Sequence, residues 1–173
     1  MMQLTMPKDI KSIVIASHNE GKVREIRSLL DPYGYKIISA KKLGINEPIE
    51  NGMTFSENSL IKSRNAAKKS GLVALADDSG LCVNSLNYRP GIYSARWAGK
   101  NKDFGMAMKK IQKLMEKNDL LSKYNRRAFF VCSLSVYFPD GKNKVFNGRV
   151  NGHLQFPPKG FNGFGYDPVF KIK

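Results

Sequence analysis

Two adjacent carboxylates, Asp77 and Asp78, follow an apolar run in the stretch ALADDSGLCV (74–83). Adjacent like charges repel each other, so a cation is expected near them. Carboxylate oxygens are the ligands that Mg²⁺ prefers, and one of the two groups could also act as a general base toward water. A turn in which either aspartate caps the Ser79-Gly80 bend is the better explanation of an isolated Asp-Asp-Ser-Gly.

A second polar run, Ser17-His18-Asn19-Glu20-Gly21-Lys22, stands between an apolar segment and a helical pattern. A helix N-terminus offers backbone N–H groups and the positive end of a dipole, and both favour an anion. Ser17 and Asn19 can donate hydrogen bonds, and Lys22 adds a positive charge. The spacing of a Walker A loop is absent, and a capped surface helix explains this run equally well.

Other polar residues have weaker signals. Glu50 lies in the polar loop IENGMTF and could supply a third oxygen ligand, whereas Lys62 lies about two turns into the next helix, where solvent exposure is the simpler expectation. Arg96 could clamp a phosphate or carboxylate, and a structural ion pair is equally consistent with it. The stretch GFGYDP (163–168) offers aromatic faces and a carboxylate, which suits either a planar base or an ordinary turn.

The elements that must position these residues alternate between strands and helices. Apolar runs predict buried strands over 11–17, 35–39 and 72–76, the last ending at the two aspartates. The capping-box spacing of Ser17 and Glu20 predicts the start of one helix, and that of Thr54 and Glu57 predicts the start of another. Asp31-Pro32 and Gly71 are expected to end these two helices.

The second half of the chain predicts a further helix and a hairpin. Asp103 is expected to cap a helix with Phe104, Met108, Ile111 and Met115 on one face. Residues 127–150 predict a long antiparallel hairpin around the turn PDGK. The order of these elements favours an α/β fold with a mixed sheet, in one domain over residues 1–173.

Composition narrows the class of protein. The 173 residues include 29 Lys and Arg against 14 Asp and Glu, a net charge of +15, which suits a nucleic acid, a membrane surface or an anionic substrate. No run of apolar residues is long enough for a membrane span, and the first residues lack the apolar core of a secretory signal. Cys82 and Cys132 lie in apolar runs and are expected to be reduced core residues of a cytoplasmic protein. The basic zone between Lys100 and Arg127 predicts the solvated face of one helix.

Four stretches together carry a family resemblance. They are ASHNEGKVREI, ENGMTFSENSLIKSRNAA, ADDSGLCVNSLNYRPGIYSARWAG and GFGYDPVF, and they span residues 13–170. In this order they resemble the Ham1-like inosine triphosphate pyrophosphatases, which hydrolyse non-canonical purine nucleoside triphosphates. The resemblance implies an elongated mixed sheet flanked by helices, two lobes with a central cleft, and a homodimer.

The resemblance also implies residue roles. Glu50 and Asp78 would bind Mg²⁺, and Asp77 and Asp78 would orient and deprotonate the attacking water. Lys62 is the third implied catalytic residue. The polar run and Lys62 would hold the triphosphate, and the segment after residue 163 would border the base. The implied substrate-binding residues are Ser17, His18, Asn19, Glu20, Gly21, Lys22, Ser79, Arg96, Phe164, Gly165, Tyr166 and Asp167.

The leading hypothesis is Mg²⁺-dependent hydrolysis of ITP, dITP and XTP to the monophosphate and pyrophosphate, without a membrane or specific nucleic acid as partner. The alternative is a basic nucleic-acid-binding module without hydrolase activity, supported by the net charge and the aromatic residues of the last loop. The absence of an RRM, KH or helix-turn-helix signature weighs against it. Family members continue into a C-terminal helix with a Ser-His-Arg motif that contacts the purine. The sequence ends at Phe170-Lys171-Ile172-Lys173, so weak selectivity for ITP over GTP is expected.

Overall fold

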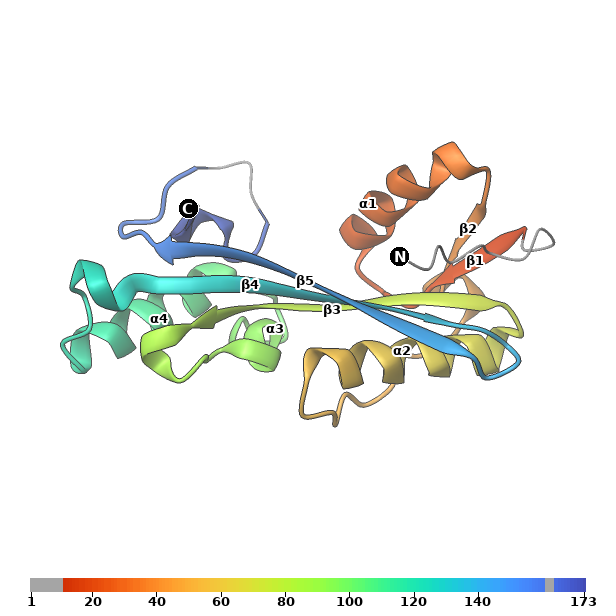
Figure 1. Cartoon of the computed structure of the whole chain (residues 1–173), viewed down its shortest axis with the longest axis horizontal. Helices are drawn as coiled ribbons and strands as arrows, with labels where there is room; N and C mark the ends of the chain where they lie inside the picture. The colour runs from red at the N-terminus through yellow and green to blue at the C-terminus, as the bar shows by residue number, and fades with distance from the viewer. Residues whose placement is uncertain (1–10, 161–163) are drawn as a thin grey trace. The chain divides into compact units, whose positions relative to one another are not determined.

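The computed structural model describes residues 11–160 and 164–173, so Gly163 of the GFGYDP stretch lies outside the described residues, as do 1–10. The described residues form a six-stranded sheet in the order β2-β1-β3-β4-β5-β6, with four α-helices (Figure 1). Strand β1 is parallel to β2 and β3, whereas β5 is antiparallel to β6, so the predicted α/β class with a mixed sheet is confirmed. The strands are β1 (Ser12–Ile15), β2 (Lys36–Ser39), β3 (Val73–Val83), β4 (Arg127–Tyr137), β5 (Asn143–Leu154) and β6 (Phe170–Ile172), and the helices are α1 (Glu20–Leu30), α2 (Phe55–Ser70), α3 (Ser94–Trp97) and α4 (Phe104–Lys117).

The chain divides into two compact units, each with its own apolar core. The first unit comprises Met1–Asp78 and Ser133–Phe146, and the second comprises Ser79–Cys132 and Asn147–Lys173. The long strands β3, β4 and β5 contribute residues to both. The central cleft and the homodimer that the resemblance implies stay predictions.

In the first unit, two helices cover opposite faces of the parallel strands (Figure 1). Side chains alternate between the faces of a strand, so successive residues of β1 and β3 pack on different helices. The face toward α1 includes Ile13, Ile15, Val73, Leu75, Val23 and Ile26. The face toward α2 includes Val14, Ala16, Ala74, Ala76, Ala66 and Ala67. Small residues on this second face let α2 approach the sheet closely.

Local signals at the ends of α2 are confirmed, and those at the start of α1 need a correction. Thr54 Oγ1 accepts a hydrogen bond from Glu57 N, and the Glu57 carboxylate accepts one from Thr54 N, so the capping box forms. For α1 the expected box at Ser17 is wrong, because Asn19 is the N-cap and its Oδ1 accepts hydrogen bonds from Gly21 N and Lys22 N. A side-chain amide two residues closer to the helix reaches these N–H groups first.

Strand β3 differs from its prediction because it does not end at residue 76. It runs through Asp77 and Asp78 to Val83, so the two aspartates lie within a strand and not in a turn. Its partner β1 ends at Ile15, opposite Leu75, whereas β4 is its hydrogen-bonded neighbour on the other side. A strand continues past a polar pair as long as one neighbour satisfies its backbone groups.

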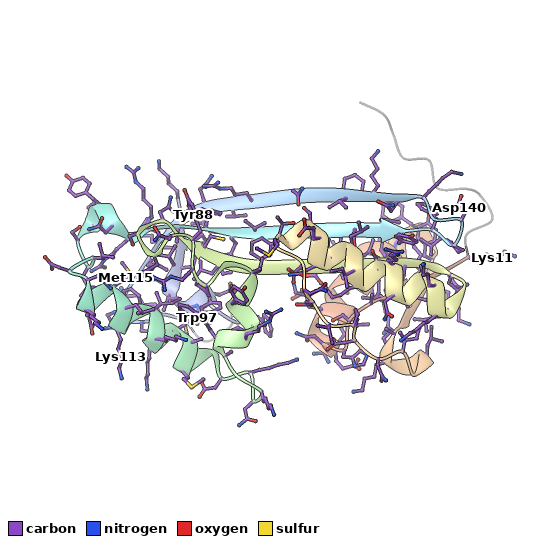
Figure 2. The ribbon with its side chains drawn as sticks, turned by 90° about the horizontal axis from the view of Figure 1, so that it is seen from below. Lys11, Tyr88, Trp97, Lys113, Met115 and Asp140 are labelled. Carbon is purple, nitrogen blue, oxygen red and sulfur yellow. The ribbon has the colours of Figure 1, made fainter. Side chains whose placement is uncertain are left out.

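In the second unit, α4 presents one apolar face to the core and one basic face to solvent. Asp103 Oδ1 accepts a hydrogen bond from Met106 N, as the predicted cap requires. Met115 is fully buried, whereas Lys113 points away from the unit (Figure 2). The prediction for this helix is therefore confirmed.

Two further predictions concern the burial of the cysteines and the absence of a membrane-spanning helix. Cys82 and Cys132 are both free thiols, and Cys82 is buried as expected. The expectation of a core position is wrong for Cys132, which lies on an exposed face of β4. Among the described residues, no helix has the length and apolar character that a membrane span requires.

Candidate active site

Asp77 and Asp78 are neighbours on β3, so their side chains point to opposite faces of the strand. Asp77 points to the side of α1, where its Oδ2 lies 3.4 Å from Lys22 Nζ. Asp78 points to the side of α2, where its Oδ1 lies 3.1 Å from Lys62 Nζ. Each carboxylate therefore has its own ammonium group, supplied by a different helix.

The two aspartates lie just beyond the carboxyl end of β1. Ile15 is the last residue of β1, and Ala16 N donates to Leu75 O before the chain leaves the sheet toward α1. Ligand sites of open α/β sheets lie beyond the carboxyl ends of strands. The fold thus brings the polar run to the side of Asp77, as the contact with Lys22 shows.

Lys62 lies between two carboxylates. Its Nζ is 2.9 Å from Glu50 Oε1 and 3.1 Å from Asp78 Oδ1, and its side chain is 14% exposed. Burial alone would lower the pKa of Lys62, but Asp78 and then Glu50 outweigh it, so this pKa lies above its ordinary value. Solvent exposure, expected from the helix alone, is wrong because Asn58 and Ala66, four residues away on each side, belong to the buried face of α2.

Asp78 has an unusual environment for a carboxylate. Burial has the largest effect on its pKa and raises it; Lys62 lowers it and Glu50 raises it again, so the pKa lies above its ordinary value. One oxygen, Oδ2, is buried and accepts no hydrogen bond in the described part of the chain. A buried acceptor without a donor calls for an explanation, and an adjacent cation or water is one.

The donors present suit a magnesium ion. Through residues 11–160 and 164–173, no three His, Cys, Asp or Glu side chains converge as a ready metal site. Glu50 and Asp78 provide two carboxylates around one ammonium group, and Asp78 Oδ2 is unsatisfied. Mg²⁺ is typically bound by one or two carboxylates together with waters and substrate phosphates, so this pair fits it.

The polar run is held by hydrogen bonds within the first unit. Ser17 Oγ accepts a hydrogen bond from Asn19 N, and the Asn19 Oδ1 already caps α1. His18 N donates to Glu47 Oε1, and the His18 Nε2 lies 2.7 Å from Ile45 O. Because a carbonyl oxygen only accepts, Nε2 carries the proton, and His18 fastens the run to the 45–47 loop.

The remaining charged side chains of this run face outward or toward β3. Glu20 is exposed, and its Oε1 lies 3.7 Å from Lys41 Nζ. Lys22 Nζ lies between Asp77 and Glu25, 3.8 Å from the Glu25 Oε2. Gly21 leaves room for the Asn19 cap, because a Cβ at this position would lie 3.2 Å from Asn19 Oδ1. Lys22 thus connects the run to Asp77.

The predicted base-binding residues lie in the second unit. Phe164 is 54% exposed, and its N–H donates to Asp167 Oδ2 at 2.8 Å. Gly165 has a φ of +65°, which favours glycine, and Phe104 packs edge-on against Tyr166. Tyr166 is only 2% exposed, so its ring belongs to the core and Phe164 offers the accessible ring.

Further contacts show how the Tyr166 and Arg96 side chains are held. The Tyr166 hydroxyl donates to Ser94 O at 2.8 Å, and burial raises its pKa well above the ordinary value. Arg96 is exposed and stacks on Tyr93, with 5.0 Å between the guanidinium carbon and the ring centroid. Ser79 is half-buried on β3, directly after Asp78. Phe164, Arg96 and Asp167 are therefore the predicted residues of this unit that are exposed.

Sequence reasoning missed two residues of the first unit. Glu47 accepts the hydrogen bond from His18 N, and Asn58 is fully buried beside the cluster, where it helps to lower the pKa of Asp78. An asparagine in a polar helix gives no signal of burial by itself. Its place four residues before Lys62, on the same helix face, was the available clue.

Paired carboxylates and ammonium groups beyond the end of a parallel strand are typical of α/β proteins that bind phosphate groups together with a cation. The Ham1 family model matches residues 13–173. The chain belongs to the Ham1 family.

Relatives and solved structures agree with this membership. A dITP/XTP pyrophosphatase of Zymomonas mobilis is 55% identical over 159 residues, which cover 91% of this chain and 75% of that protein. A dITP/XTP pyrophosphatase of Rhodopseudomonas palustris is 51% identical over 158 residues, 91% of this chain and 75% of that protein. The structure of a HAM1 protein from Coxiella burnetii superposes with a TM-score of 0.84 at 38% identity, over 93% of this chain and 81% of that chain.

Proposed function

We propose that this chain hydrolyses the non-canonical purine nucleoside triphosphates dITP, ITP and XTP to the monophosphate and pyrophosphate. The observation that carries the proposal is the half-buried cluster in which Lys62 lies between Glu50 and Asp78. The proposal is supported by the names of the relatives, dITP/XTP pyrophosphatases that are 51% and 55% identical to this chain.

The first unit supplies the charges for the reaction. Water attacks the α-phosphorus, the bond from the α-phosphorus to the bridging oxygen breaks, and pyrophosphate leaves with that oxygen. Asp78 accepts the proton of the water, and its raised pKa brings it closer to neutral pH than an ordinary aspartate, as a general base requires. Asp77 orients the water together with Lys22, its partner at 3.4 Å.

The lysines and the polar run hold the triphosphate. Lys22 and Lys62 each carry a positive charge beside the aspartates, which suits the negative phosphate oxygens. The Ser17 hydroxyl and the Asn19 amide nitrogen add neutral donors. Glu50 and Asp78 would hold Mg²⁺, and the bound ion would stabilise the charge that develops on the phosphate oxygens.

Further proposals concern the base and the assembly. The exposed Phe164 ring gives a purine a surface on which to stack, and Asp167 holds the backbone of that loop. A site that pairs with the 6-oxo edge of hypoxanthine or xanthine would reject adenine, whose amine leaves polar groups unpaired. We also propose a homodimer that acts in the cytoplasm, since its substrates belong to the nucleotide pool.

Nucleic-acid binding has one feature in its favour. A hollow of about 530 Å³ lies along α4 in the second unit and is lined by Lys109, Lys110, Lys113 and Lys117. The lining of this hollow contains none of the predicted catalytic groups. Lysines at this spacing on one exposed helix face are also what an ordinary solvated helix presents. Steeply salt-dependent binding of a random oligonucleotide, without nucleotide hydrolysis, would favour this alternative.

Pyrophosphate release tests the proposed function. Purified protein is incubated with XTP, ITP, GTP and ATP in turn, with Mg²⁺ or with EDTA. Release of pyrophosphate from XTP and ITP, dependent on Mg²⁺, is expected. If folded protein leaves all four nucleotides intact, the proposed function is wrong.

A further inference from the structure

Asn58 lies in the first turns of α2 and is fully buried. Its Oδ1 accepts a hydrogen bond of 2.9 Å from Gly52 N, but its Nδ2 has no partner in the described part of the chain. Buried side-chain amides normally satisfy both ends, so an unpaired NH₂ group in this position calls for a reason.

The missing partner is close by. Asp78 Oδ2 is the other buried polar atom that lacks a hydrogen bond among the described residues, and it is an acceptor where Asn58 Nδ2 is a donor. Asn58 lies four residues before Lys62, so the two share one face of α2, and Lys62 Nζ is 3.1 Å from Asp78 Oδ1. The side chain of Asn58 also lowers the pKa of Asp78, which agrees with a position on the side of α2 that faces this carboxylate. The two unsatisfied atoms are chemically complementary.

The other end of Asn58 reaches the segment that carries Glu50. A Cβ at Gly52 would lie 2.7 Å from Asn58 Oδ1, so this close approach requires glycine. Glu50 stands two residues before Gly52, and its Oε1 contacts Lys62. Asn58 is thus linked to the 50–52 loop by its carbonyl oxygen and lies on the same face of α2 as Lys62, the partner of Asp78.

We infer that Asn58 is a positioning residue that sets the separation of Glu50 and Asp78. Its carbonyl oxygen fixes the Glu50 loop, and its amide nitrogen donates to Asp78 Oδ2 when the site is ordered by its ligands. A carboxylate oxygen has two acceptor sites, so Oδ2 can take the amide and still face a cation. A neutral amide can donate this hydrogen bond and leave the negative charge of Asp78 available to a cation. A further lysine in its place would neutralise that charge. The role in catalysis rests on the proposed function, whereas the contact itself does not.

A reciprocal exchange tests the contact. Asn58→Asp, Asp78→Asn and the double variant are unfolded in urea with EDTA present. Asn58→Asp places two carboxylates side by side and should lower the urea midpoint clearly, whereas the double variant restores one carboxylate and one amide and should recover at least half of that loss. Asn65→Asp, on the same helix with its amide bound to Asn46 O, is the matched control and should show no such recovery with Asp78→Asn. Strictly additive changes in the Asn58 and Asp78 variants would overturn the inference.

Hydrogen exchange provides a second measurement that does not depend on a folded Asn58→Asp variant. Asn58→Ala removes the acceptor of Gly52 N, so the Gly52 amide should exchange about tenfold faster or more, because its exchange then requires only local opening. Asn65→Ala should leave it unchanged. Unaltered exchange at Gly52 in Asn58→Ala would contradict the inference. Failure of the proposed function is distinguishable, because it appears as absent pyrophosphate release from the wild-type protein.

Discussion

The two units present their candidate functional side chains in opposite ways. In the first unit, Lys62 and Asp78 are taken largely out of water and stabilise each other as charges. In the second, Phe164 is an exposed ring, while its neighbours Tyr166 and Phe104 form the packed support beneath it. Charges that are partly removed from water interact more strongly than exposed ones, whereas a ring contributes through contact area.

This difference leads to distinct expectations for substitutions. In the first unit, removing one charge leaves another uncompensated, so both stability and the chemical step should respond. In the second unit, removing a ring should weaken substrate binding and leave the chemical step alone. Substitutions in the two units can therefore be compared by which kinetic constant changes.

The largest effect is expected for Asp78→Asn. The change preserves the volume and the strand but removes the charge that would bind Mg²⁺ and accept a proton, so kcat with XTP should fall ~10²-fold or more. Steady-state kinetics measure it, with Asp140→Asn, an exposed turn residue paired with Lys142, as the control. Near-normal turnover in Asp78→Asn would mean that the carboxylate has only a structural role.

Lys62→Met should reduce stability as well as activity. It leaves Glu50 and Asp78 without their shared ammonium group, and a half-buried ion pair broken in this way should cost about 2–3 kcal/mol, less than a fully buried one. Urea unfolding in EDTA measures the loss. Lys68→Met, on the exposed side of the same helix, is the control and should be almost neutral. Equal midpoints for the two variants would contradict the ion-pair account.

Phe164→Ala should raise KM for XTP by roughly 5- to 100-fold, the range expected when one base loses its aromatic stacking partner, with little change in kcat.

Tyr166→Phe should lower the stability of the protein without weakening substrate binding. It removes only the hydrogen bond to Ser94 O, so unfolding becomes easier by about 1 kcal/mol and KM stays the same. A larger effect on KM from Tyr166→Phe than from Phe164→Ala would contradict these roles, because it would make Tyr166 and not Phe164 the residue that binds the base.

The smallest effect concerns pH. The pKa of Asp78 is raised in the folded state above the ordinary 3.8, so the folded protein binds a proton there at pH values at which the unfolded chain does not. The stability contributed by Asp78 therefore increases as pH falls through its raised pKa toward 3.8 and is lost as pH rises. Relative to Asp78→Asn, the metal-free wild-type protein should gain unfolding free energy as the pH falls through the raised pKa of Asp78 toward 3.8. A difference that shrinks on acidification would contradict the direction of the shift.

Much of the secondary structure could be predicted because its signals are local. The capping box at Thr54 and the glycine at residue 71 lie within a few residues of the backbone groups they satisfy, so α2 is found at its predicted place. The length of β3 could not be predicted from its own residues. It depends on β4, which is more than forty residues away in the sequence and keeps the strand extended past the aspartates.

The candidate site shows the same limit. The residue types at Glu50, Asp77 and Asp78 pointed to cation and phosphate chemistry, yet the direction of Lys62 was not readable from α2 alone. It depends on which face of α2 packs on the sheet, and that is decided by small residues such as Ala66 against Ala74 and Ala76. Asn58 was missed for the same reason, since burial of a polar residue is a property of the packed fold.

Single-turnover hydrolysis of XTP in H₂¹⁸O tests whether the first unit performs the chemical step. Wild type, Asp78→Asn and Phe164→Ala are compared at saturating nucleotide, and both the rate constant and the labelled product are measured. We expect ¹⁸O in the monophosphate, a rate constant reduced ~10²-fold in Asp78→Asn, and one within about twofold of wild type in Phe164→Ala. Label in pyrophosphate, or a chemical step that slows as much in Phe164→Ala as in Asp78→Asn, would contradict this expectation.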